Sequence, residues 1–267
     1  MQAGGRIKHG LAATFAAGAA IGTLGGLIGL GGAEFRLPLL IGVFGFAALQ
    51  AVILNKAMSL VVVAAALVFR TKAVPLDLVL SHAPVIINLL AGSLAGAWLG
   101  AGWATRMRHQ TLYKVIAVLL LLIAVALMSE QWLVGHGEPL LVGPAQWVAG
   151  MLAGFGIGVV ASLMGVAGGE LLIPTLVLLF GAEIKLAGSL SLAVSLPTMI
   201  VGFMRYSRDS SFQVLGQNKR FVLVMALGSL IGAGIGGALL GVVPAAVLLP
   251  LLSAILVVSA VKVWRHE

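Results

Sequence analysis

The sequence contains no cysteine, and charged residues occupy only 9% of its 267 positions. The absence of cysteine excludes disulfides, thiolate metal sites and thiol-based sulfur chemistry. Soluble domains carry roughly a quarter of their residues as charged side chains, whereas here 61% are hydrophobic and mean hydropathy is +1.15. The short alternating segments of a membrane β-barrel are also missing. The sequence therefore predicts an all-α integral membrane protein in contact with the lipid bilayer.

Catalytic and cofactor-binding patterns are missing as well. The five histidines have no metal-site spacing, and no Walker-type loop, catalytic triad or clustered catalytic polar residues are visible. We therefore expect no enzyme, no metal, no cofactor and no ATP-driven pump. The net charge is +8, but the basic residues stand singly or in pairs between apolar runs, as topology-setting loop charges do. This pattern argues against a nucleic-acid partner.

The chain carries an internal duplication. Glu34 and Pro38 correspond to Glu170 and Pro174, a displacement of 136 positions, and the same displacement places 92–96 on 228–232. Agreement in early and late segments without a change of register indicates two copies of one unit. We place the first membrane repeat at 1–135 and the second at 136–267, together forming a single membrane domain.

Each repeat contains four long apolar segments and one short one. The long segments are 11–31, 48–69, 78–103 and 112–129 in the first repeat, and 145–167, 184–204, 219–241 and 244–263 in the second. The short segments, 35–46 and 171–181, each carry a proline and reach only part of the way across a hydrocarbon core. If the short segments cross, each half has five crossings and the halves are inverted.

Loop charges favour inversion, because inverted copies carry opposite Lys/Arg bias in matching loops. Arg6 and Lys8 at the N-terminus correspond to 130–143, which contains no Lys or Arg; the basic loop around Arg106 corresponds to 241–250, which has no charge. The sequence thus predicts inverted repeats of five segments in the cell membrane, with both termini cytoplasmic.

Two glycine-rich runs, 29–34 and 165–170, directly precede the short segments. Paired, Gly/Pro-interrupted segments indicate a transporter's binding site, and a helix N-terminus suits an anion because its N–H groups are free. The alternative is close helix packing, which we favour for the later clusters 92–100 and 228–236. Candidate substrate-binding positions in the two runs are Gly31, Gly32, Ala33, Gly168 and Gly169.

Several polar residues lie inside apolar segments, where each charge costs about 2.5–3.5 kcal/mol on insertion scales. Lys56 is a candidate counter-charge for a bound anion; alternatively it snorkels to the interface or pairs with Glu34. The other candidate substrate-binding residues are Asn55, Ser59, Ser189, Ser191 and Ser195. Serines in membrane helices also bond a neighbouring helix or their own helix carbonyls.

Glu34 and Glu170 are equivalent in the repeat and should face one central site if the halves are inverted. A bound anion would favour protonation of either carboxylate, so both are candidates for proton coupling. The alternative is that each carboxylate caps the amides at the start of its short helix.

At these motifs the chain resembles the TauE/SafE family of sulfite exporters and organosulfur-anion permeases. That family carries a duplicated GxGGG motif followed by a Val/Ile-Pro step, here ending in 36–39 and 172–175, and a downstream Ala-x-x-x-Ser-Leu stretch, here 187–192. Two departures stand out: Ala33 and Ala167 each replace a glycine, and glutamates occupy positions 34 and 170, which are often apolar in the family. The resemblance covers nearly the whole chain.

The resemblance implies a small-anion permease, with sulfite, sulfonates or related oxyanions as typical cargo. Together with the repeat and the buried charges, it predicts a secondary anion transporter, with an anion channel of the same architecture as the alternative. Saturable flux with counterflow would indicate the carrier. A homodimer is compatible with either function.

Overall fold

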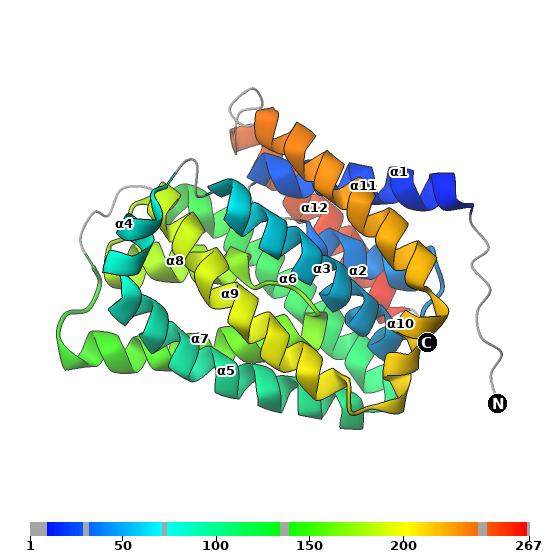
Figure 1. The fold of residues 1–267 in the computed structure, drawn as a ribbon, viewed down its shortest axis with the longest axis horizontal. Coiled ribbons are helices and arrows are strands. Elements are labelled where there is room, and N and C mark those ends of the chain that lie inside the picture. Colours follow the sequence, from blue (N-terminus) through cyan, green and yellow to red (C-terminus); the bar gives the residue numbers. More distant parts are fainter. Residues whose placement is uncertain (1–9, 29–31, 71–73, 134–138, 240–244, 266–267) are drawn as a thin grey trace.

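The computed structural model describes residues 10–28, 32–70, 74–133, 139–239 and 245–265. The regular secondary structure within these ranges is helical, with no strand, so the all-α prediction is confirmed (Figure 1). The first half holds α1 (Leu11–Ile28), α2 (Ala33–Gly42), α3 (Ala48–Arg70), α4 (Leu76–Ser81), α5 (Ala83–Arg106) and α6 (His109–Leu133). The second half holds α7 (Pro144–Met164), α8 (Gly169–Phe180), α9 (Ile184–Tyr206), η1 (Ser210–Phe212), α10 (Gln213–Gln217), α11 (Lys219–Ala238) and α12 (Ala245–Trp264).

Five of the described helices are long and apolar enough to cross a membrane: α3, α5, α7, α9 and α11. The two short helices, α2 and α8, contain 10 and 12 residues. At about 1.5 Å per residue they reach roughly half of the hydrocarbon core. The predicted short segments therefore exist as separate half-length helices.

The predicted single segment 78–103 is divided in two, with α4 and α5 meeting at His82. Pro84 lies in the first turn of α5. Because proline has no N–H, it cannot donate to the carbonyl of Leu80, and a continuous helix would lose that bond. Proline is tolerated in a first turn, where the N–H has no intrahelical partner.

The two halves contain the same helices at the same spacing. Helices α2 and α8 begin at Ala33 and Gly169, and α3 and α9 begin at Ala48 and Ile184, 136 positions apart in both cases. Even the small α4 has a counterpart in α10. The shared helix order agrees with a duplication, while the inversion of the halves and their boundary at residue 135 stay predictions.

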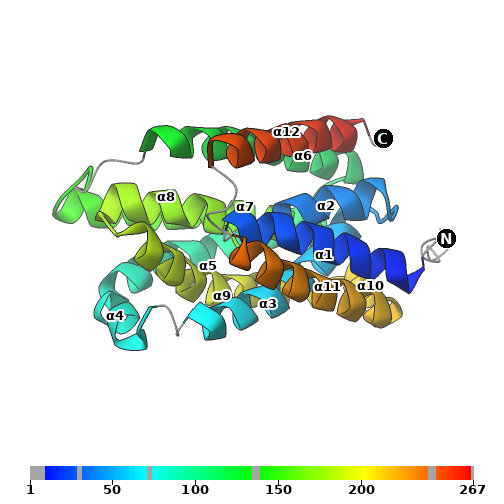
Figure 2. The same ribbon diagram turned by 90° about the horizontal axis from the view of Figure 1, so that it is seen from above.

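The halves are interleaved in space. Helix α1 packs along α11 and its counterpart α7 packs along α5, so each close pair joins the two halves. The equivalent helices α6 and α12 pack on each other, as do α3 and α9. Figure 2 shows α6 beside α12 on one side of the molecule and α1 beside α11 on another.

Glycines allow the close pairs to form. A Cβ added to Gly92 or Gly96 of α5 would collide with the carbonyl oxygens of Met151 and Phe155 in α7. A Cβ on Gly228 would likewise collide with Phe15 O of α1, so no larger side chain fits there. The packing interpretation of the later glycine clusters therefore agrees with the structure.

Candidate functional site

Both short helices begin after a sharp break in the chain. Gly32 and Gly168, which immediately precede α2 and α8, have φ values of 70° and 81°, and Gly165 at the end of α7 has a φ of 68°. Residues with a Cβ rarely adopt this left-handed conformation, so the breaks depend on glycine. The Gly31 prediction falls outside the described residues.

The break between α7 and α8 satisfies its own carbonyls. Gly165 N donates to Ser162 O at 3.2 Å, and Val166 N donates to Ala161 O at 3.0 Å. A Cβ on Gly165 would collide with Val52 O of α3. The break is thus held directly against α3, the helix that carries Asn55 and Lys56.

Asn55 connects the two breaks. Its Nδ2 donates to Ala33 O, in the first turn of α2, at 2.9 Å, and to Met164 O, the last residue of α7, at 3.2 Å. The side chain is fully buried, and its Oδ1 has no hydrogen-bond partner in the described part of the chain. One amide therefore fixes the distance between the ends of two broken helices from different halves.

Lys56 lies against the carboxyl end of α7. Its Nζ donates to Ala161 O at 3.2 Å and to Ser162 Oγ at 3.4 Å, and Tyr206 OH donates to Ser162 O at 2.8 Å. The side chain is fully buried, so it does not snorkel. A cation at a helix C-terminus is favoured by the helix dipole. The described residues contain no ion pair between Lys56 and Glu34, and Lys56 serves instead as a cap for α7.

The two repeat-related acids meet in the interior. Glu34 is 0% exposed and Glu170 is 4% exposed, and the two acidic side chains are near enough to influence each other electrostatically. Each acid occupies the first turn of its short helix, so the two interacting side chains extend from the amino ends of α2 and α8.

The capping alternative has little support at Glu34. Its carboxylate lies near its own main-chain amide, yet neither oxygen meets a donor at hydrogen-bonding geometry within the described ranges. Oε2 of Glu170 is likewise without a partner there. Buried polar atoms in folded proteins are nearly always paired, so these oxygens mark an unusual site.

The prolines of the short helices add free acceptors at the same place. Pro38 and Pro174 lie four residues after Glu34 and Glu170, and proline has no N–H to donate to the carbonyl four residues earlier. The main-chain carbonyl of each acid therefore loses its usual helical partner. The repeat places a titratable carboxyl and a freed carbonyl at the start of both short helices.

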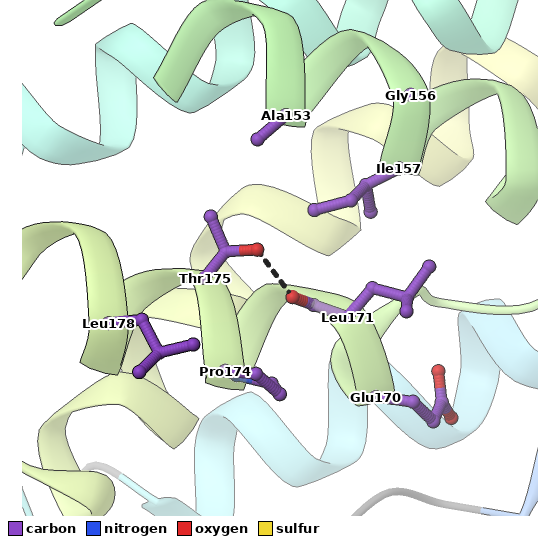
Figure 3. A pocket seen from close by; sticks show the side chains of 8 residues that line it. All are labelled: Ala153, Gly156, Ile157, Glu170, Leu171, Pro174, Thr175 and Leu178. Carbon is purple, nitrogen blue, oxygen red and sulfur yellow. Dashed lines mark hydrogen bonds between the residues drawn. The ribbon is translucent and has the colours of Figure 1, made fainter. Parts of the chain in front are cut away.

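A pocket of about 360 Å³ lies between α7 and α8 and reaches Glu170. Figure 3 shows α7 residues on one side, α8 residues on the other, and Glu170 at one end. The Thr175 hydroxyl at the wall donates to Leu171 O at 2.7 Å. The pocket is lined by Ala153, Gly156, Ile157, Glu170, Leu171, Pro174, Thr175 and Leu178.

The profile of the family described as "Sulfite exporter TauE/SafE" matches residues 14–263. The chain belongs to the TauE/SafE family. Neither a search of curated proteins nor a search of solved structures returned a match. As a member of a sulfite-exporter family with several membrane-length helices, the protein is a membrane transporter.

The candidate serines of this TauE/SafE protein have different surroundings. Ser195 Oγ donates to Ala167 O in the break before α8 at 2.8 Å, while Ser191 Oγ donates to Gly188 O of its own helix at 2.9 Å. The hydroxyls of Ser59 and Ser189 are buried and make no hydrogen bond in the described structure. These two hydroxyls are therefore the ones available to a ligand.

Arg36 was missed by the sequence reasoning. It is fully buried in α2, and its positive charge acts on Glu34, two residues earlier. A cation inside a short apolar segment is the sequence signal that marks this residue. The equivalent position in α8 is Leu172, so the cation belongs to one half alone.

Proposed function

We propose that this TauE/SafE transporter is a secondary carrier of small anions, with sulfite, sulfonates or related organosulfur oxyanions as substrates. The proposed binding site lies at the two glycine-rich breaks, and Glu34 and Glu170 carry a coupling proton. The cell membrane, with both termini cytoplasmic, is the proposed location. The family membership supports the substrate class, and the burial of both acids at the starts of the short helices supports the mechanism.

The observation that carries the proposal is the burial of two mutually interacting acids, Glu34 and Glu170, in the first turns of α2 and α8. Helix amino ends carry partial positive charge and attract anions. Two ionised carboxylates would oppose an oxyanion at this point. Protonation removes that repulsion, so binding of the anion and binding of the proton favour each other.

The ligand contacts would come from buried groups without protein partners. The Ser59 and Ser189 hydroxyls can donate to an oxyanion, and the main chain at Gly32, Gly168 and Gly169 can approach it without an intervening side chain. Lys56 and Asn55 are already engaged with main-chain carbonyls. They would hold the breaks in place and would contact substrate only after rearrangement.

Reconstituted liposomes provide the test. We expect sulfite or sulfonate uptake to saturate, to show counterflow and to increase when a proton gradient is imposed. Liposomes with inorganic phosphate or acetate provide the anion controls, and empty liposomes control for passive entry of protonated acids. Flux that does not saturate and shows no counterflow would indicate an anion channel, and absence of any anion flux would contradict the proposal.

A further inference from the structure

The two buried acids differ in one respect that the repeat does not predict. Glu170 lines the pocket between α7 and α8, whereas Glu34 is 0% exposed. The pocket reaches the protein surface at Gly156, an exposed residue of a membrane-length helix. One member of the carboxyl pair can therefore be approached from outside along a defined route, while the other is enclosed.

The residues that line the pocket favour an apolar ligand. Glu170 contributes the ionisable group, and the hydroxyl of Thr175 is already committed to Leu171 O. The remaining lining residues present carbon atoms. Its volume of about 360 Å³ falls within the range of small-molecule sites, roughly 300–1,000 Å³. Charged oxyanions would find no donor along these walls.

The nearby cations interact with groups other than Glu170, so the carboxyl group of Glu170 remains available for reaction. The Lys56 ammonium is bonded to the end of α7, and the Arg36 charge acts on Glu34. The ionisable side chain that interacts with Glu170 is therefore Glu34. Hydrophobic carbodiimides react with carboxyl groups in apolar surroundings, and the Glu170 side chain lines such a pocket.

We propose that the pocket between α7 and α8 is a binding site for small apolar, carboxyl-directed molecules, and that Glu170 is the residue they modify or bind. The inference concerns access to Glu170 and does not depend on which anion the protein carries. It gives the two repeat-related acids different accessibility: small molecules from outside the protein can reach Glu170, whereas Glu34 is enclosed beside it.

A hydrophobic carbodiimide is the probe. The carboxylic acid adds across one C=N bond: its oxygen bonds to the central carbon and its proton moves to a nitrogen. Transfer of the acyl group from oxygen to nitrogen then gives a stable N-acylurea. No atom leaves and no other reactant is needed. The product is Glu170 heavier by the mass of one carbodiimide.

Dicyclohexylcarbodiimide would be added to the full-length protein in liposomes, and the modified residue identified by peptide mass spectrometry. We expect one adduct, at Glu170, and no adduct on Glu34. A cationic, water-soluble carbodiimide should leave Glu170 unmodified, because the apolar walls exclude it. Failure of the hydrophobic probe to label Glu170, or labelling of Glu34 instead, would overturn the proposal.

Gly156→Leu tests the route without touching either acid. A Cβ at this position meets no atom within 4 Å, so leucine fills the pocket without displacing the backbone. We expect labelling to slow by about tenfold, equivalent to roughly 1.4 kcal/mol of lost binding. Gly234→Leu is the matched control, because Gly234 also has open space but lies on α11. Equal labelling of the two variants would contradict the pocket route.

The variants also separate this inference from the proposed function. Labelling is measured by mass and requires no transport, so a protein that carries no sulfite still gives an answer. E170Q should abolish the adduct. If that variant does not fold, the test rests on which residue is labelled in the unmutated protein and on the comparison of Gly156→Leu with Gly234→Leu.

Discussion

The first break, around Gly32 and α2, and the second break, around Gly168 and α8, have the same backbone plan and different chemistry. Each has a left-handed glycine, an acid in the first turn and a proline four residues later. Within the described residues, the buried cations Arg36 in α2 and Lys56 in α3 belong to the first half, and the second half has Leu172 and Leu192 at the equivalent positions.

This comparison separates what the duplication preserved from what diverged. The geometry that brings the helix ends together is common to both halves. The buried cations near the acids are not common to both halves. Glu34 has a nearby cation and is enclosed, whereas Glu170 faces Glu34 and the pocket. A symmetrical framework thus holds an asymmetric pair of acids, and substitutions that exchange residues between halves can test it.

The largest expected effect concerns the acids themselves. We expect E170Q to abolish acceleration of flux by a proton gradient while pH-independent exchange continues, because glutamine keeps the size of the side chain but does not titrate. E34Q should keep part of the acceleration, since Glu170 remains reachable from the pocket. The measurement is sulfite flux in liposomes with and without the gradient. Full proton-driven transport by E170Q would remove this residue from coupling.

Arg36→Leu makes the first break resemble the second. The variant removes a fully buried cation whose charge acts on Glu34, and leaving buried polar groups without a partner costs about 1–3 kcal/mol, and more when the groups are charged. We expect a large fall in thermal stability in detergent. The double variant E34Q/R36L is the control, because it removes both charges and should recover part of the loss. A double variant no more stable than R36L would contradict an energetic link between the two residues.

Lys56→Leu also copies the second half. It removes the donor to Ala161 O and Ser162 Oγ, and loss of hydrogen bonds from a charged group costs about 1.5–3 kcal/mol. Tyr206→Phe is the matched comparison, since it removes one neutral bond to the same turn and should cost about 1 kcal/mol. Chemical denaturation of both proteins tests the order. A K56L protein as stable as the wild type would show that the cap is dispensable.

The smallest expected difference is between Gly32→Ala and Gly168→Ala. Both positions have positive φ, which costs a non-glycine residue roughly 1–2 kcal/mol. At Gly32 the new methyl group also meets Ile21 O at 2.5 Å, whereas at Gly168 it meets the flexible Ile157 Cγ2 at 3.0 Å. We therefore expect Gly32→Ala to be the less stable by about 1–2 kcal/mol. Equal melting temperatures would count against this difference in packing.

Much of the helical plan follows from the sequence because it depends on hydrophobic length and on the repeat. The short helices and the breaks were predictable from Gly32, Pro38 and their counterparts. The hydrogen-bond partner of Lys56 was not predictable, because a repeat fixes which residues correspond along the chain and does not fix where a long side chain ends. The Asn55 bridge joins helices 109 positions apart, and the pocket at Glu170 depends on how α7 and α8 pack.

The glycine contacts also have a consequence for how the protein is made. Gly18 of α1 lies against Met225 of α11, a residue synthesised more than 200 positions later. During synthesis α1 therefore enters the bilayer long before α11 has been made, and until then the glycine face of α1 has no partner helix. Helix α5 gains its partner α7 earlier, after α6 has been made, and its second partner α9 follows α8. Assembly is complete only when the last quarter of the chain arrives, so a chain truncated before α11 would present an unpaired α1 surface to the membrane's quality control.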